Sequence, residues 1–208
     1  MPSAFSLLLI GLLTLCATSP VAAQTVAAKA RPADNAAQLR LLLDGAKKQV
    51  GVTTAYDPAY RKLAYPGGDV PLATGVCADV IIRAFRNAGI DLQQQLHEDM
   101  TSHFTAYPQK WGLKQPDPNI DHRRVLNLMT WFRRQGKVLP VTVLPADYLP
   151  GDVVAWDLGH GLTHIGIVAD IRAAGSKPPF LVIHNIGGGA RQEDILFAYA
   201  IIGHYRYF

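Results

Sequence analysis

The 208-residue sequence lacks an apolar run long enough to cross a bilayer, which takes about 20 residues. Its longest apolar stretch, residues 5–15, is shorter than that, and no Lys or Arg precedes it. Val21-Ala22-Ala23 supplies the small residues that a signal peptidase requires. We therefore expect residues 1–23 to be a signal peptide cut before Gln24, and the mature protein to be periplasmic or secreted without stable membrane insertion. An uncleaved N-terminal anchor is the alternative.

Cysteine is scarce, with two residues in the whole chain, Cys16 and Cys77. Leu15 stands where a lipoprotein signal would have a small residue, which argues against lipidation of Cys16. Signal cleavage removes Cys16, so the mature protein has no partner for an internal disulfide. An unpaired thiol is a liability in an oxidising compartment. Cys77 is therefore either a reactive thiol or a small buried hydrophobe.

Charge is also sparse, because Asp, Glu, Lys and Arg make up 17% of the chain and the formal net charge is +4. This balance suits an anionic cell envelope, and it serves ordinary solubility equally well. The triplet Gly187-Gly188-Gly189 lacks the Lys and Ser/Thr of a phosphate-binding loop. We expect no nucleic-acid partner, no cofactor and a monomeric protein.

The predicted helices come first and the predicted strands follow. Hydrophobic periodicity and capping residues predict helices over residues 34–50, 76–88, 91–105 and 121–136, with irregular loops at 51–76 and 107–119. Apolar runs between turn residues predict strands at 138–143, 152–157, 164–170, 180–185 and 200–207. This order indicates an α+β fold with an antiparallel sheet. Residues 24–33 are expected to form a flexible lead-in, and residues 34–208 one domain.

Cys77 lies at the predicted start of a helix. The backbone N–H groups of a first helical turn are unpaired and the helix dipole is positive there, so both favour a thiolate. A helix start therefore lowers the pKa of a cysteine below its usual value of about 8.5. The same N–H groups could hold the oxyanion that forms when a nucleophile attacks a carbonyl.

Two of the seven histidines occupy positions that suit a base for this thiol. His164 begins the apolar strand THIGIVAD, and His184 ends the strand FLVIHNIGGG ahead of the glycines. If the two strands pair, the rings meet at one end of the sheet, as nucleophile, base and orienting group require. The remaining histidines are expected to be solvated or capping residues: His97, His103, His122 and His204. Asp79 is expected to support the helix start.

Three stretches in this order after a helix-opening cysteine resemble the NlpC-type papain-like cysteine peptidases of bacterial cell walls: GDVVAWD (151–157), HIGIVAD (164–170) and VIHN (182–185). More narrowly, YDPAYRKLAYPGGDVP, GVCADVIIRAFRNAGIDL and HNIGGG resemble the YijF-like exported bacterial proteins, a domain-of-unknown-function group within that superfamily. The similarity covers about residues 50–208. It implies a papain-like fold, with the nucleophile helix packed on the C-terminal antiparallel sheet.

The resemblance also implies the roles of individual residues. Cys77 would be the nucleophile, His164 the base and His184 the third residue that orients the base. A tyrosine ahead of the nucleophile often borders the oxyanion site in these peptidases, and Tyr65 matches best, with Tyr56 as the alternative.

Two features depart from the family pattern. The usual Asp-Cys-Ser-Gly around the nucleophile is here Val-Cys-Ala-Asp at 76–79, and the insertion at about 91–136 is longer than in the smallest members.

The activity that the resemblance implies is hydrolysis of amide bonds, with peptidoglycan or its peptide fragments as substrate. The residues expected to contact that substrate are Asp79, Asn185, Tyr56 and Trp111.

Two other classes of function stay open. A zinc-dependent envelope hydrolase could use Asp157, His160, His164 and His184, although Gly159 and Gly161 favour a turn there over a helical pair of ligands. A non-catalytic cell-wall-binding module on the same fold is the other alternative, and only an activity assay separates it from an enzyme.

Overall fold

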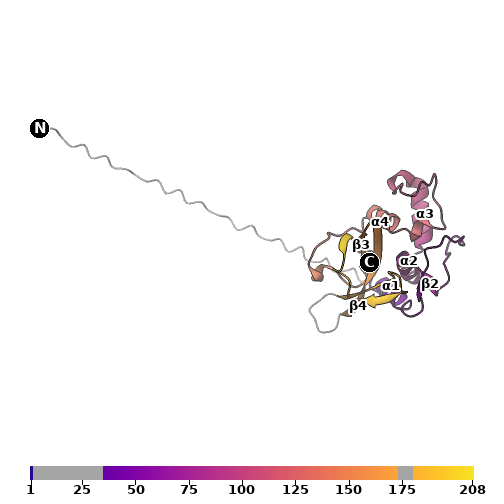
Figure 1. Cartoon of the computed structure of the whole chain (residues 1–208), viewed down its shortest axis with the longest axis horizontal. Coiled ribbons are helices and arrows are strands. Elements are labelled where there is room, and N and C mark those ends of the chain that lie inside the picture. The colour runs from indigo at the N-terminus through magenta and orange to yellow at the C-terminus, as the bar shows by residue number, and fades with distance from the viewer. Residues whose placement is uncertain (2–34, 173–179) are drawn as a thin grey trace.

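The computed structural model describes Met1 and residues 35–172 and 180–208 (Figure 1). It is an α+β structure with four α-helices and a five-stranded antiparallel sheet among these residues. The α-helices are α1 (Asn35–Lys47), α2 (Cys77–Asn87), α3 (Leu92–His103) and α4 (Val125–Arg134). Three short 3₁₀ helices accompany them: η1 (Phe104–Ala106), η2 (Asp121–Arg123) and η3 (Pro145–Asp147). The predicted signal peptide and lead-in lie outside the described residues.

The large sheet has the strand order β6-β5-β4-β3-β7. Its strands are β3 (Val153–Gly159), β4 (Leu162–Arg172), β5 (Phe180–His184), β6 (Arg191–Glu193) and β7 (Ala200–Tyr205). Every neighbouring pair is antiparallel, so the predicted class and sheet direction are confirmed. The predicted strand at 138–143 is wrong, because this segment makes only an isolated bridge from Val138 to Tyr205. Pro140, which has no backbone N–H, interrupts it.

Residues 51–76, predicted as an irregular loop, also contain β1 (Ala55–Tyr56) and β2 (Thr74–Gly75). These two short strands pair in parallel, with Tyr56 opposite Gly75. Figure 1 shows β2 beside α2, at the end of the molecule that carries the helices. The pairing therefore brings Tyr56 beside Gly75, two residues before the start of α2.

The apolar residues of the sheet divide between its two faces, as strand alternation requires. Val153, Ile165 and Ile183 join the helices in one buried cluster, which includes Phe85 and Phe132. On the other face, a second cluster consists of Tyr148, Val154, Trp156, Val168, Val182 and Leu196. The helix α2 is almost wholly covered, so its first residue is held at a fixed place relative to β4.

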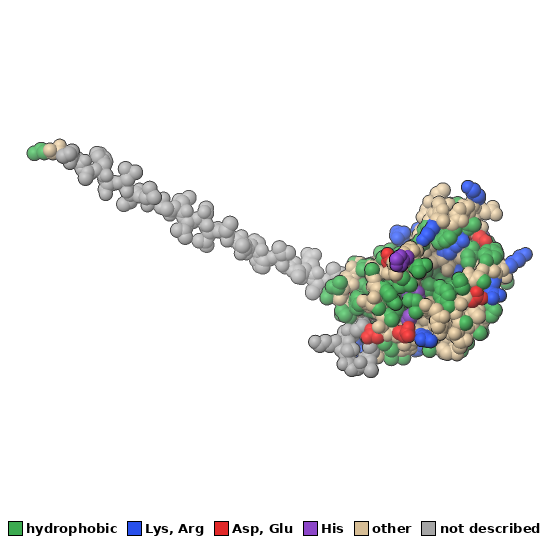
Figure 2. Space-filling model, viewed as in Figure 1, with side chains coloured by type: hydrophobic (Ala, Val, Ile, Leu, Met, Phe, Trp, Pro, Cys, Tyr) green, Lys and Arg blue, Asp and Glu red, His purple; other side chains and the backbone are tan. Residues whose placement is uncertain are grey.

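No helix among the described residues is long and apolar enough to cross a membrane. Figure 2 shows hydrophobic and uncharged side chains over much of one face, with Lys and Arg toward its edges.

Candidate functional site

Cys77 is the first residue of α2, as the sequence predicts. The backbone before it is extended at Val76, whose N–H donates to Oδ2 of Asp79 at 2.6 Å. Asp79 thus supports the helix start, as expected. The same carboxylate accepts two hydrogen bonds from Arg123, each 2.9 Å long, and both side chains are buried. Because these partners occupy Asp79, the structure gives no support to its predicted contact with substrate.

Tyr56 lies beside Cys77 because β1 pairs with β2. Burial raises the pKa of the Tyr56 hydroxyl to about 12, and the neighbouring Cys77 and Asp79 add to the rise. Asn185 fastens this region to the end of β5, since its side-chain amide donates to Gly75 O at 2.9 Å. Asn185 is fully buried, so the structure shows it holding the backbone together, while its predicted substrate contact stays untested.

The structure places Tyr65, the preferred tyrosine of the sequence analysis, elsewhere. Its ring packs edge-on against His97 at 5.1 Å, and 43% of the residue is exposed. Tyr65 does not line the cleft at Cys77, whereas Tyr56 does. The alternative tyrosine is therefore the one beside the thiol.

The thiol of Cys77 does not have the lowered pKa that a helix start predicts. Burial raises this pKa to about 11, although nearby backbone N–H groups of Ile165 and Ala78 oppose the rise. The N–H groups expected from the helix start do contribute, but desolvation of the charged form outweighs them. At neutral pH Cys77 is therefore a neutral thiol in the free protein.

His164 and His184 lie in contact, as the sequence predicts. Nε2 of His164 and Nδ1 of His184 are 3.0 Å apart, and both rings are buried. Nε2 of His184 in turn lies 2.9 Å from Oε2 of Glu193 on β6, at ion-pair distance but without a well-formed hydrogen bond. Burial lowers the pKa of His164 to about 3, and the neighbouring His184 adds to the effect. Burial also lowers the pKa of His184, while Glu193 opposes that shift.

Gly166 makes room for this contact. A Cβ atom built at Gly166 would lie 2.7 Å from Cγ1 of Val182 and 3.2 Å from Cβ of His184. Any larger residue would push β5 and the His184 ring away from β4. The glycine of the HIGI motif is therefore required by the packing beside the histidine pair.

Cys77 and His164 occupy neighbouring positions without touching through a hydrogen bond. The sulfur lies against the backbone N–H of Ile165, the residue that follows His164. The His164 ring stacks on Trp156 at 5.6 Å, on the side of the sheet away from the helix cluster. Among the described residues, Nδ1 of His164 has no hydrogen-bond partner. It is not one of the polar atoms that are both unpaired and fully shielded from solvent. No contact between the Cys77 sulfur and the His164 ring is present among the described residues, so proton transfer between them requires the His164 ring to turn toward the thiol.

An open cleft of about 250 Å³ reaches Cys77. Three basic residues border it, Lys110, Arg123 and Arg124, together with Trp111 and Leu162. Arg124 lies over the Trp111 ring at 4.2 Å from its centre. Trp111, predicted to contact substrate, thus lines the cleft that leads to the thiol.

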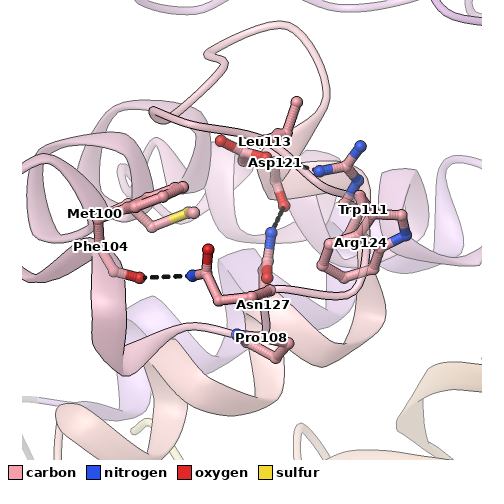
Figure 3. A pocket seen from close by; sticks show the side chains of 9 residues that line it. Met100, Phe104, Pro108, Trp111, Leu113, Asp121, Arg124 and Asn127 are labelled. Atoms are coloured by element: carbon pink, nitrogen blue, oxygen red, sulfur yellow. Dashed lines mark hydrogen bonds and ion pairs between the residues drawn. The ribbon is translucent and has the colours of Figure 1, made fainter.

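A smaller cavity of about 10 Å³ lies behind Trp111. Figure 3 shows Trp111 and Arg124 on one side of it, with Met100 and Phe104 on the other. Trp111, from the segment at 107–119, and Arg124 border both spaces and therefore lie between them.

Two of the histidines expected to be solvated or capping residues are buried instead, so that prediction is wrong for them. His122 is 2% exposed, and burial lowers its pKa to about 4. His204 is 1% exposed and lies 2.9 Å from Oδ2 of Asp152. His103, in contrast, is exposed near the end of α3, as expected.

Among the described residues, the four proposed as zinc ligands do not form a group that could hold a metal ion. His160 is exposed at a turn with a positive φ of 53°. The described part of the chain contains no group of three or more His, Cys, Asp or Glu side chains that could hold a metal ion.

Glu193 is the site residue that the sequence analysis missed. It lies in a three-residue polar strand, RQE, which has no apolar periodicity. Its place next to His184 follows from the pairing of β5 with β6, in which His184 stands opposite Arg191. The one available signal was a carboxylate soon after the glycine triplet.

Comparison with known proteins assigns the chain to a family. The uncharacterized protein YijF of Escherichia coli (strain K12) is 58% identical over 167 residues, which span 80% of each chain. The sequence profile of the family described as Domain of unknown function (DUF1287) matches residues 43–207, a range that includes every site residue described above. On this match and this relative, the chain belongs to the DUF1287 family.

Proposed function

We propose that this protein is an exported cysteine hydrolase with an NlpC-type papain-like fold, which cleaves amide bonds in peptidoglycan peptides. One observation carries the proposal: a free thiol opens a helix and lines a cleft, beside the strand β4, whose His164 pairs with His184 of β5. Tyr56 beside the thiol adds a hydroxyl donor. A nucleophile, a base, an orienting group and oxyanion donors are the parts that acyl transfer requires.

The raised pKa of Cys77 and the lowered pKa of His164 both favour the uncharged pair at neutral pH. The reaction therefore begins from a thiol and an imidazole, and the proton moves as the sulfur attacks. The Cys77 sulfur forms a bond to the substrate carbonyl carbon while its proton passes to Nδ1 of His164. This step requires the His164 ring to turn from its place against Trp156 toward the Cys77 sulfur when substrate enters.

The oxyanion formed by this attack would accept hydrogen bonds from the Cys77 N–H and the Tyr56 hydroxyl. When the intermediate collapses, the carbon–nitrogen bond breaks and His164 gives its proton to the leaving amine. A water molecule then attacks the acyl-enzyme, His164 takes a proton from it, and the proton returns to the sulfur as the acid product leaves.

The test is digestion of purified sacculi by the mature protein and by Cys77→Ala, with products identified by mass. We expect the wild type to release peptide fragments and Cys77→Ala to release none, because the acyl-enzyme needs the sulfur. Circular dichroism of Cys77→Ala establishes that the fold is retained. Cleavage by Cys77→Ala at the wild-type rate would contradict the proposal, and so would wild-type protein that binds sacculi without releasing products.

A further inference from the structure

Glu193 completes a chain of three side chains that ends at the nitrogen of His164 assigned above as the base. The chain runs from Glu193 through His184 to His164, with separations of 2.9 and 3.0 Å. The His184 side chain is 1% exposed, whereas the Glu193 side chain is 39% exposed. The chain therefore connects the solvent at β6 with the buried start of β4.

A neutral imidazole carries one proton, so its two nitrogens divide into one donor and one acceptor. The lowered pKa values of both histidines keep both rings neutral at pH 7. Oε2 of the ionised Glu193 lies 2.9 Å from Nε2 of His184, and although the pair makes no well-formed hydrogen bond, this negative charge favours a proton over a lone pair on Nε2. Nδ1 of His184 is then an acceptor.

The same rule fixes the next ring. Because Nδ1 of His184 accepts, the proton of His164 must lie on Nε2, the nitrogen 3.0 Å away. Nδ1 of His164 is left unprotonated, with its lone pair available. The carboxylate thus determines which nitrogen of His164 is basic, although it touches only the other histidine.

We propose that Glu193 is a positioning residue that holds His164 in the tautomer with a free, basic Nδ1. This inference rests on the proposed function for its consequence in catalysis, but the tautomer itself is a property of the free protein. The charged groups that face the pair on β6 are Glu193 and Arg191, whose Nη1 lies 4.0 Å from Oε1 of Glu193. Burial lowers the pKa of His184 most, and Glu193 opposes this. Arg191 makes a smaller contribution that also lowers the pKa, so it favours the neutral ring.

The experiment compares the mature wild type with Glu193→Gln by two-bond ¹H–¹⁵N correlation spectra of ¹⁵N-histidine-labelled protein at pH 7. The amide of glutamine both donates and accepts, so it no longer forces the proton of His184 onto Nε2. We expect Nδ1 of His164 to be unprotonated in the wild type and partly protonated in Glu193→Gln. Glu98→Gln is the matched control, because it removes the same charge from an exposed residue of α3.

Hydrolysis supplies the second readout. We expect kcat of Glu193→Gln to fall by about tenfold to a hundredfold with little change in KM, because the base is in the wrong tautomer for part of the time. The loss stays below the roughly 10⁴-fold cost of a wrong tautomer in a fully buried triad, since Glu193 is partly exposed. Glu193→Asp, which keeps the carboxylate, should recover part of the lost rate.

A wild-type spectrum with the proton of His164 on Nδ1 overturns the inference without any variant. It is also overturned if Glu193→Gln leaves both histidine tautomers unchanged. Failure of the proposed function would be recognised separately. If Cys77→Ala retained hydrolytic activity, the proposed function would fail, but the histidine spectra of the wild type and of Glu193→Gln would still report the tautomer.

Discussion

Two histidine–carboxylate networks occupy the same sheet, and they differ in whether their hydrogen-bonding atoms are all used. In the network around Asp152, His204 contacts Asp152 through Nε2 at 2.9 Å and Pro140 O through Nδ1 at 3.1 Å. Arg206 donates twice to the same carboxylate, at 2.7 and 2.6 Å. Both ring nitrogens of His204 have a partner. The network therefore connects β7 to the residue before β3 and to the segment before η3.

The network of Glu193, His184 and His164 ends differently. Its last nitrogen, Nδ1 of His164, has no partner within the described residues, and its carboxylate is partly exposed. The buried polar atom of this network that lacks a hydrogen bond is Nε2 of His184, which lies 2.9 Å from the Glu193 carboxylate. Buried polar atoms are normally paired, so such an atom calls for an explanation. Burial of a histidine beside a carboxylate therefore does not by itself distinguish a structural network from the proposed catalytic one, and the two networks differ in how many of their polar atoms are paired.

Burial alone would raise the pKa of Asp152, but the hydrogen bonds from Arg206 and His204 outweigh it and lower the pKa. A lowered carboxyl pKa contributes stability above the unfolded value of about 3.9, and this contribution is lost as the pH falls through the folded pKa. In the other network, burial dominates and favours neutral histidines. One network therefore holds a charged carboxylate, whereas the histidines of the other are neutral, as the proposed proton transfer requires.

The largest expected effect comes from breaking the open network at His164. His164→Asn removes the proposed base, and hydrolysis should slow by about 10²- to 10⁴-fold, the usual contribution of a general base. Because His164 is buried and bonded to His184, the variant should also lose some stability, so the rate is compared per folded molecule. The measurement is release of peptide fragments from sacculi over time.

His160→Asn is the matched control for that prediction. His160 lies exposed at a turn with φ of 53°, a conformation that Asn tolerates. This variant should hydrolyse at the wild-type rate. Equal rates for His164→Asn and His160→Asn would remove the functional distinction between the two networks.

The next effect comes from breaking the saturated network at Asp152. Asp152→Asn leaves the Arg206 charge without its buried counter-ion, and removal of one partner from a buried pair costs about 3–5 kcal/mol. We expect the free energy of unfolding, measured with urea, to fall by that amount while kcat per folded molecule is retained.

Asp170→Asn is the control for the loss of stability, because Asp170 forms a surface pair with Lys47 in which both side chains are more than a third exposed. Such pairs contribute up to about 1 kcal/mol. A loss for Asp152→Asn no greater than that for Asp170→Asn would show that the saturated network does not stabilise the fold.

The sequence predicts the elements that carry apolar periodicity. The helix predicted at 76–88 is observed at Cys77–Asn87, and the strand predicted at 180–185 is observed at Phe180–His184. The contact between His164 and His184 could be predicted because both residues stand on paired strands near one end of the sheet. Local patterns were sufficient wherever the site residue belongs to a regular element.

The remaining site residues depend on contacts between distant segments. Tyr56 reaches Cys77 through a two-residue parallel pair inside a stretch that reads as a loop. Glu193 belongs to a polar strand that exists only because β5 offers an edge. The raised pKa of Cys77 depends on how much protein surrounds the sulfur, which no local pattern reports.

The smallest of the three effects tests how the tyrosines differ. Tyr56→Phe removes the hydroxyl next to Cys77 and keeps the ring, so the fold and the rate of substrate binding should be preserved. Hydrolysis should slow by about tenfold to a hundredfold, at or below the cost of losing one oxyanion donor, because the Cys77 N–H remains. Tyr65→Phe, the same change at an exposed ring outside the cleft, should leave kcat unchanged. If Tyr65→Phe slows hydrolysis and Tyr56→Phe does not, the oxyanion site lies on the other side of the thiol from the one assigned here.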